Sequence, residues 1–179
     1  MHRPSVVGTW GSTVEDRAAS YPCDELIGRP DIVVFRAVDV DAAAPLVFRW
    51  LCQLRAAPYS YDWIDNLGRK SPRVLTPGLE ELEVGQGFMT IFRLVGFDEG
   101  STITLDSSTP VFGRVVCTYR VTASVSSQSH LVAKLLVASP RGPLGPVVRH
   151  LLPVGDLVMM RKQLLTLKVL AERDARSPP

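Results

Sequence analysis

From Pro143 to Ala171 the chain reads PLGPVVRHLLPVGDLVMMRKQLLTLKVLA, which is long and apolar enough to form one helix across a whole domain. The residues before it read mostly as short strands separated by turns, so they predict a sheet that needs an element to close on. A long helix after a strand-rich region indicates a curved sheet wrapped around that helix. We therefore expect a cavity between the two, and a ligand site inside it.

The long helix has two apolar faces when its residues are projected at about 100° each. The stripe that we assign to the sheet consists of Leu157, Met160, Leu164, Leu167 and Ala171. A second stripe, well around the helix, consists of Val154, Val158, Leu165 and Val169. One sheet covers one stripe, so the second predicts a cover: either the N-terminal residues Trp10, Leu26 and Ile27 or a second copy of the chain in a homodimer. Pro153 and Gly155 predict that the regular helix begins near Val154.

Six upstream stretches have the composition or alternation of strands. They are residues 31–40, 79–83, 87–97, 102–107, 114–123 and 131–139. Residues 114–123 alternate between an apolar face and a more polar one, which predicts an antiparallel sheet with one face in water. Two short helices, 45–55 and 61–67, follow the first strand. The prediction is an α+β fold in which a curved antiparallel sheet of about six or seven strands wraps around the C-terminal helix.

Residues 1–30 form an N-terminal arm with its own character. Ser12-Thr13-Val14-Glu15 resembles a capping box and predicts a short helix from about Thr13 to Ala19. Trp10, Tyr21, Leu26 and Ile27 are too many large apolar groups for a free tail. We expect the arm to pack on a ligand-binding domain at residues 31–174, with residues 175–179 as a tail.

The composition bears on location and partners. A net charge of +2 gives no global attraction to nucleic acid. No uncharged apolar run reaches the roughly 18 residues that span a bilayer, and the N-terminus lacks the apolar segment of a secretory signal. Cys23, Cys52 and Cys117 lack redox spacing, and the last two lie in apolar runs, which favours buried thiols in a reducing compartment. We expect a cytoplasmic protein with no nucleic-acid partner and no stable membrane insertion.

Signatures of catalysis and cofactor binding are absent from the sequence. Gly85-Gln-Gly87 lacks the third glycine and the following helix of a dinucleotide loop, and there is no P-loop or nucleophile elbow. The three histidines, His2, His130 and His150, have no metal-ligand spacing. We expect no metal and no cofactor, and we assign no catalytic residue.

Three stretches carry a resemblance to a known superfamily: residues 50–54 (WLCQL), 57–68 (APYSYDWIDNLG) and 157–165 (LVMMRKQLL). Together with the order of elements, they resemble the START/Bet v 1-like (SRPBCC) superfamily, in particular a bacterial subgroup similar to polyketide cyclases and dehydrases. The resemblance covers roughly residues 31–173 and implies the helix-grip fold. The superfamily includes carriers, receptors and enzymes, so it implies a cavity without naming its ligand.

The expected ligand contacts are polar or adaptable side chains placed near that cavity. Tyr119 is the best polar group, because its inward neighbours are apolar. Arg93 lies on a strand that is apolar on both faces: pointing inward it would need a carboxylate from Asp62, Asp65 or a ligand, and pointing outward it would be a snorkelling surface residue. The full set is Trp50, Tyr59, Tyr61, Asp62, Asp65, Met89, Arg93, Tyr119, Met160 and Leu164.

These residues leave two main functions open. The first is binding of a hydrophobic or amphipathic small molecule, such as a lipid, a polyketide or an isoprenoid-like compound. The alternative is a polyketide cyclase or dehydratase, because Asp62 and Asp65 beside tyrosines are groups that move protons in such reactions. Helix-dipole stabilisation of Asp62 and an ion pair between Asp65 and Arg69 would explain the same carboxylates structurally. A purely structural or partner-binding domain is a third interpretation.

Overall fold

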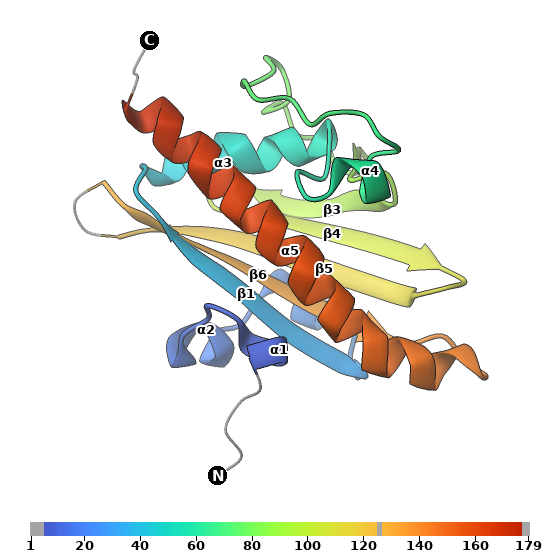
Figure 1. Ribbon diagram of the computed structural model, residues 1–179. Helices are drawn as coiled ribbons and strands as arrows, with labels where there is room; N and C mark the ends of the chain where they lie inside the picture. Colours follow the sequence, from blue (N-terminus) through green and yellow to red (C-terminus); the bar gives the residue numbers. More distant parts are fainter. Residues whose placement is uncertain (1–5, 125–126, 177–179) are drawn as a thin grey trace.

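An antiparallel sheet of six strands gripping one long helix organises the chain, which we describe from a computed structural model over residues 6–124 and 127–176. The strand order is β1-β6-β5-β4-β3-β2. The strands are β1 (Ile32–Val40), β2 (Gly87–Phe88), β3 (Phe92–Asp98), β4 (Thr102–Thr109), β5 (Gly113–Ala123) and β6 (Ser129–Ala138). Helix α5 (Leu144–Arg176) crosses one face of the sheet diagonally (Figure 1). The predicted helix-grip fold is therefore confirmed.

Two short helical segments follow β1, as expected. Helix α3 (Ala44–Cys52) starts with Pro45 in its first turn and buries an apolar face that includes Trp50 and Leu51. A 3₁₀ turn, η2 (Gln53–Arg55), extends it. Helix α4 (Asp62–Asp65) is a single turn. Both α3 and α4 lie on the same side of the sheet as α5 (Figure 1).

Two predicted strands between residues 79 and 97 need correction. Residues 79–83 form turns and irregular backbone, because the guanidinium of Arg55 binds the carbonyl oxygens of Gly78, Leu79 and Glu81 at 2.9–3.2 Å in place of a strand partner. Residues 87–97 split into β2 and β3, because Met89 and Thr90 adopt positive φ angles (44° and 70°) that no strand accommodates.

Helix α5 begins at Leu144, ten residues before the predicted start at Val154. Pro153 lies inside the helix, where it cannot donate a backbone hydrogen bond. The carbonyl oxygen of Pro153 accepts a hydrogen bond from Arg36 Nη2 (3.2 Å), so a side chain from the sheet binds the helix at this point. The stripe assigned to the sheet is confirmed, since Met160, Leu164, Leu167 and Ala171 are buried and Leu157 is half-buried.

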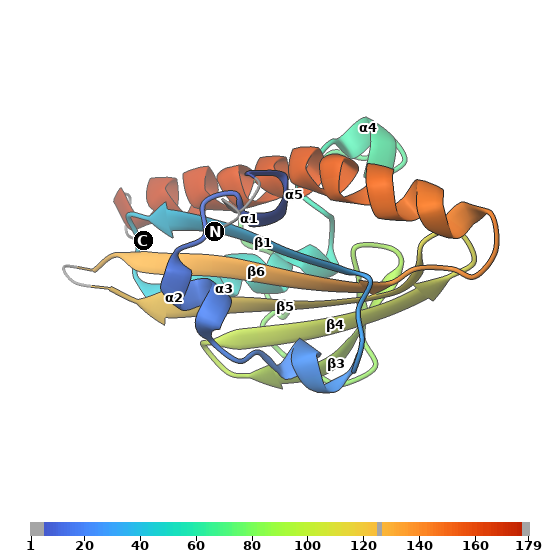
Figure 2. The ribbon, with the colours of Figure 1, turned by 90° about the horizontal axis from the view of Figure 1, so that it is seen from below.

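The N-terminal residues cover the opposite face of the sheet. Of their elements, α2 (Val14–Ala18) and the 3₁₀ turn η1 (Pro22–Glu25) lie there, and Figure 2 shows α2 on the side of the sheet away from α5, whereas α1 (Val6–Thr9) lies beside β1 and α5. An apolar cluster forms there from Tyr21, Cys23, Ile27, Phe35, Ala37, Val116, Val132 and Leu136. The expectation that this face of β5 lies in water is wrong for its centre, because the arm buries Val116 and Thr118 completely.

Polar contacts hold the arm on this face. The backbone N–H of Cys23 donates to Thr118 Oγ1 (3.1 Å), and Lys134 Nζ lies 2.5 Å from Asp24 Oδ1. The Tyr21 ring accepts two cations, with the Arg120 guanidinium 4.1 Å and the Lys134 ammonium 5.0 Å from its centre. The sheet therefore presents two cations, Arg120 and Lys134, that the arm contacts.

The arm leaves most of the second stripe of the long helix uncovered, which corrects one of the two expected covers, although α1 lies beside α5. Leu26 and Ile27 pack against the sheet, and of the three named residues only Trp10 approaches α5, with the Arg161 guanidinium 5.5 Å from its ring. Val154, Val158 and Val169 remain exposed to at least half of their surface, whereas Leu165, the fourth residue of that stripe, is half-buried. The buried cations of the sheet and the apolar cluster around Tyr21 hold the arm on the other side.

Truncating Tyr21 tests how strongly the arm stabilises the fold. We expect Tyr21→Ala to lower the free energy of unfolding by about 3 kcal/mol, because it removes a buried ring, its edge contact with Phe35 and two cation contacts. Val14→Ala, at an exposed position of the arm, should change it by less than about 0.5 kcal/mol. Urea unfolding measures both, and equal effects of the two substitutions would contradict a packed arm.

Candidate functional site

A row of side chains across the middle of the sheet points at α5. Tyr119 on β5 pairs in register with Ala133 on β6, and Ala133 pairs with Arg36 on β1. Strands are about 4.8 Å apart, so Tyr119 and Arg36 lie about 10 Å apart with the small Ala133 between them. The surrounding inward side chains are apolar. This row supplies the polar groups of the interior.

Arg36 is a buried cation at one end of the row. Its side chain is 0 % exposed, and its Nη2 lies 2.7 Å from Asp156 Oδ2 on α5. The guanidinium also donates to the carbonyl oxygens of Pro153 (3.2 Å) and Phe35 (2.9 Å). A guanidinium removed from water requires such a set of acceptors.

The protonation of Asp156 is altered by the same burial. Loss of water raises the pKa of the Asp156 carboxyl from 3.8 to about 6, although the neighbouring Arg36 acts in the opposite direction. Burial likewise lowers the pKa of Arg36, against the attraction of Asp156. Both shifts indicate that the loss of hydration outweighs the attraction within the pair.

A second polar cluster centres on Gln163 of α5. The Tyr119 hydroxyl donates to Gln163 Oε1 (2.7 Å), and Gln163 Nε2 donates to the carbonyl oxygen of Pro58 (2.7 Å). The same amide nitrogen lies 3.0 Å from Met89 Sδ. Through these contacts Gln163 links α5 to three other parts of the fold: β5 (Tyr119), the segment after η2 (Pro58) and the β2–β3 connection (Met89).

The two polar links have matching spacings on the sheet and on the helix. Asp156 and Gln163 are seven residues apart, which corresponds to two helical turns and about 10.5 Å. Arg36 and Tyr119, their partners, are about 10 Å apart across two strand spacings. Sliding or rotating α5 by one residue would break both links at once.

Tyr59 places a hydroxyl without a hydrogen-bond partner in the interior. Within the described residues its oxygen is buried and unpaired, and its side chain is only 1 % exposed. The ring packs edge-on against Trp50 with 6.0 Å between centres, and the backbone holds a positive φ of 56°. Burial raises the pKa of Tyr59 to about 12, so the group is a neutral donor.

The structure gathers six of the ten expected ligand contacts beneath α5. They are Trp50, Tyr59, Met89, Tyr119, Met160 and Leu164. Tyr119 and Met89 belong to the Gln163 cluster, whereas Trp50 donates its indole N–H to Asp174 Oδ2 (3.1 Å) near the end of α5. These six side chains come from β5, α3, α5, the η2–α4 connection (Tyr59) and the β2–β3 connection (Met89).

The other four expected contacts lie elsewhere. Tyr61 is half-buried at the start of α4. Asp62 accepts hydrogen bonds from the backbone and hydroxyl of Ser71, and Asp65 accepts one from the hydroxyl of Ser60 in place of the expected pair with Arg69. These hydrogen bonds hold the local loop in place, so both carboxylates have a structural role that requires no part in catalysis. Arg93 is exposed and donates to the Gly85 carbonyl oxygen (3.1 Å), so the inward orientation considered for it is wrong.

Sequence reasoning missed Arg36, Asp156 and Gln163. Arg36 shares the parity of Val34, Val38 and Val40 in strand β1, and this parity was a usable signal for an inward side chain. Asp156 precedes Met160 by four residues, which places both on the same helix face. Gln163 had no comparable signal, because its role depends on where Pro58 and Met89 fold.

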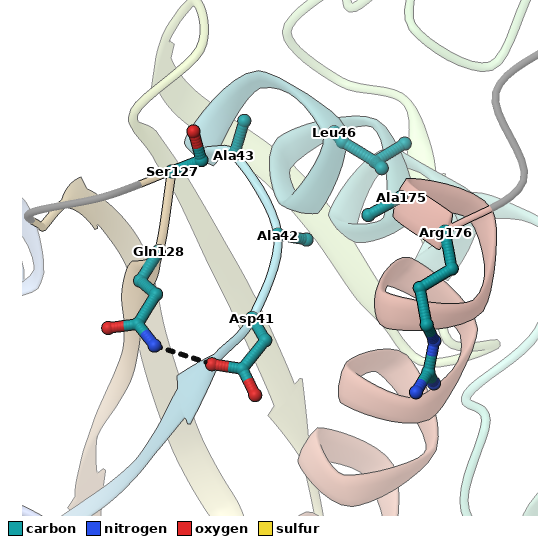
Figure 3. A pocket seen from close by; sticks show the side chains of 8 residues that line it. All are labelled: Asp41, Ala42, Ala43, Leu46, Ser127, Gln128, Ala175 and Arg176. Carbon is teal, nitrogen blue, oxygen red and sulfur yellow. Dashed lines mark hydrogen bonds between the residues drawn. The ribbon is translucent and has the colours of Figure 1, made fainter.

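A shallow pocket lies away from this interior cluster (Figure 3). It has a volume of about 570 Å³ and lies where the start of α3, the β5–β6 connection and the last residues of α5 meet. Its lining is Asp41, Ala42, Ala43, Leu46, Ser127, Gln128, Ala175 and Arg176, and none of the ten expected contacts is among them. Asp41 is already paired there, accepting from Gln128 Nε2 at 2.7 Å.

The interior itself is closely packed in this conformation. Trp50 and Leu164 have no surface accessible to water, so no water-sized void touches either side chain. Among residues 6–124 and 127–176, no group of three or more His, Cys, Asp or Glu side chains is arranged to hold a metal ion. The chemistry offered by the interior is therefore hydrogen bonding and one buried ion pair within apolar surroundings.

Comparisons with known proteins support the fold and leave the activity open. No protein-family model and no curated protein sequence matches the chain. The ZhuI aromatase/cyclase from Streptomyces sp. R1128 is similar in structure, with a TM-score of 0.54, 16 % identity, and coverage of 81 % of this chain and 96 % of that one. The di-domain aromatase/cyclase StfQ of the steffimycin biosynthetic pathway is also similar, with a TM-score of 0.53 and 14 % identity. The match covers 82 % of this chain and 53 % of that one.

A third similar structure is a protein of Thermus thermophilus, with a TM-score of 0.52, 16 % identity, and coverage of 80 % of this chain and 99 % of that one. At such identities the likeness establishes the helix-grip fold alone. It does not assign a substrate or a reaction.

The buried ion pair can be tested by removing one partner or both. We expect Asp156→Ala to lower the free energy of unfolding by about 3–5 kcal/mol at pH 7, because it leaves the Arg36 guanidinium buried and unpaired. The double variant Arg36→Met with Asp156→Leu should return to within about 1 kcal/mol of the native protein or exceed it. Urea unfolding of the three proteins measures this, and equal stabilities of the single and double variants would contradict it.

The same pair predicts a pH dependence. The folded carboxyl of Asp156 binds its proton more tightly than the unfolded one, so its contribution to stability is largest below pH 3.8 and declines as the pH rises to about 6. The double variant should lack that part of the decline. If the native protein also shows no such decline in stability between pH 3.8 and about 6, the pKa of Asp156 is not raised in the folded protein.

Two identical tyrosine substitutions should have opposite effects on stability. Tyr59→Phe removes an unpaired buried hydroxyl and should raise the free energy of unfolding by about 1 kcal/mol. Tyr119→Phe leaves Gln163 Oε1 without its donor and should lower it by about 1–2 kcal/mol. Thermal and urea unfolding measure both, and destabilisation by both changes would mean that Tyr59 has a partner in solution.

Proposed function

We propose that the protein binds a hydrophobic or amphipathic small molecule, such as a lipid, a polyketide or an isoprenoid-like compound, between the sheet and α5. The observation that carries this proposal is the Tyr59 hydroxyl, which is buried without a partner among otherwise apolar side chains. Leaving such a group unpaired costs about 1–3 kcal/mol. An oxygen atom of a bound ligand would satisfy it and recover that free energy.

The remaining polar groups of the interior favour a ligand with both an apolar body and a few oxygen atoms. The Tyr119–Gln163 pair and the Arg36–Asp156 pair are set in walls that are otherwise apolar. Ligand sites commonly combine an apolar lining with a small number of fixed polar groups that orient the ligand. The apolar walls would supply affinity, and Tyr59 and Gln163 would supply orientation.

Ligand access requires the interior to open, and residues 56–91 are the segment that we propose to move. Of the five non-glycine residues with positive φ among the described residues, four lie here: Tyr59, Leu67, Met89 and Thr90. Such conformations are strained and occur often at ligand clamps and switch regions. Two side chains of η2 hold the segment, with Gln53 bonded to the backbone of Thr76 and Arg55 to three carbonyl oxygens.

Movement of Met89 would create the first space for a ligand. Its thioether lies against Gln163 and Tyr119, and its side chain is only partly buried. An unbranched methionine adapts to different shapes at little cost, so it suits a position that a ligand displaces. Withdrawal of Met89 would also free the Gln163 amide for a ligand oxygen.

The cyclase or dehydratase alternative has less support. Asp62 and Asp65, its expected proton carriers, are engaged by Ser71 and Ser60 in the α4 loop. The interior carboxyl with a pKa near neutrality is Asp156, and Arg36 holds it at 2.7 Å. A binding function needs none of these groups to exchange a proton, so it is the simpler account.

Ligand binding is tested with cis-parinaric acid, a fluorescent polyene fatty acid, and by mass spectrometry of organic extracts of the purified protein. We expect saturable binding, and we expect Tyr59→Phe to weaken it about fivefold to tenfold through loss of one hydrogen bond. Tyr21→Phe is the matched control, because Tyr21 is a buried tyrosine on the opposite face of the sheet. The affinity of this variant for cis-parinaric acid should equal that of the native protein.

Three outcomes would contradict the proposal. They are no saturable binding by the folded protein together with extracts free of ligand, equal losses for Tyr59→Phe and Tyr21→Phe, and recovery of an added poly-β-ketone as a cyclised product. The last outcome would establish the enzymatic alternative instead.

A further inference from the structure

The outer face of α5 is apolar along most of the helix. Its residues are Leu144, Val147, Leu151, Val154, Val158 and Val169, each between 49 % and 65 % exposed. The first five follow the 3-4-3-4 spacing of a single stripe, and a projection at about 100° per residue places it opposite the stripe that packs on the sheet. A helix with apolar residues on both sides is normally covered on both sides.

Helix α4 and the residues after it add a second exposed apolar group. Trp63 is 76 % exposed, and Ile64 and Leu67 are also exposed. Figure 2 shows α4 rising on the side of the molecule where α5 lies, away from the face covered by the arm. We call these three residues and the outer stripe of α5 the outer apolar face. Exposed large apolar groups on one side of a protein mark an interaction surface.

The charges around this face are predominantly positive. Arg161 and Lys162 of α5 are exposed beside it, whereas Arg149 pairs with Asp31 (3.8 Å). The acids of α5 near the face are engaged, because Asp156 is bound to Arg36 and Glu172, next to Val169, pairs with Lys168 (2.7 Å). Beyond Leu67, the exposed residues Arg69, Lys70 and Arg73 outnumber the two carboxylates of α4, which accept hydrogen bonds from serines. The occupant of the face therefore has to offer apolar surface and negative charge together.

A second copy of the chain does not match these requirements. The same face on another molecule would bring Arg161 and Lys162 toward the same cations of the first, and the nearby acids Asp156 and Glu172 are already paired with Arg36 and Lys168. An anionic bilayer offers both features, because its acyl chains accept apolar side chains and its headgroups carry negative charge. Exposed tryptophan is favoured at that boundary.

We propose that the outer apolar face docks on the surface of an anionic lipid bilayer, with α5 lying in the plane of the interface and Trp63 inserted beside it. No helix in the described parts of the chain is long and apolar enough to cross a membrane, so the proposed contact is peripheral. Docking uses none of the interior groups, so it stands apart from small-molecule binding beneath α5. It would place the strained segment 56–91 next to the lipid.

Sedimentation with lipid vesicles tests the proposal on the full chain. Vesicles of phosphatidylcholine alone are compared with vesicles in which about one lipid in three is phosphatidylglycerol. We expect the protein to pellet with the anionic vesicles only, and about 1 M salt should weaken binding severalfold, because it shortens the screening length to about 3 Å. Fluorescence of the native protein should shift to the blue with anionic vesicles, and Trp63→Phe should remove that shift, since Trp50 is already buried and Trp10 is half-buried against Arg161.

Substitutions on the outer apolar face should weaken vesicle binding without unfolding the protein. We expect at least about a tenfold loss for Leu151→Glu and for Val158→Glu, since each replaces an exposed apolar side chain by an anion. Val14→Glu is the matched control: Val14 is 67 % exposed on α2 behind the sheet and should leave binding unchanged. Urea unfolding confirms that all three variants fold.

Two results would overturn the inference. One is failure of the folded protein to bind either vesicle. The other is a stable dimer in solution that Leu151→Glu dissociates, which would make this face a contact between copies of the chain. Binding of cis-parinaric acid by Leu151→Glu separates this test from the ligand proposal, because that variant should keep the interior intact while losing the vesicles.

Discussion

The ion pair between Arg36 and Asp156 is the constraint on which the arrangement of this protein depends. A guanidinium at the centre of a strand, with no exposure to water, needs an acceptor from the element above it, and α5 supplies Asp156 and the carbonyl oxygen of Pro153. Two turns along the helix, Gln163 binds Tyr119 across the same row of the sheet. The two links fix both the rotation and the position of α5, which apolar packing alone specifies less strictly, because apolar contacts are non-directional.

The sheet is covered on both faces, and each face has a different partner. Helix α5 with α3 buries the inner side, whereas the arm around Tyr21 buries the outer side through Thr118, Lys134 and a second apolar cluster. This explains why β6 is buried on nearly every residue, although it belongs to an antiparallel sheet. Most of the arm packs on the sheet and it reaches α5 through α1 and Trp10, so Leu151, Val154 and Val158 of the outer stripe remain exposed.

The candidate site combines features that sequence patterns reveal with others that they do not. Tyr119, Met160 and Leu164 follow from strand alternation and helical spacing, which fix the direction of a side chain from its neighbours in sequence. The unpaired state of the Tyr59 hydroxyl cannot be predicted in this way, because it depends on which groups from distant elements come within hydrogen-bonding reach. Arg93 illustrates the same limit: its strand is apolar on both sides, and only the contact with Gly85 decides its orientation.

The sequence by itself determined the helix-grip fold, the order of its elements and the helix face that meets the sheet, because these depend on local periodicity and on turn residues. The tertiary structure alone decided the partner of each buried charge, the side on which the arm lies and the helix face that stays open. Burial of Arg36 makes Asp156 necessary, and burial of Lys134 draws Asp24 and Tyr21 behind the sheet. These pairings join residues that are far apart in the sequence, and they come close together only when the chain folds.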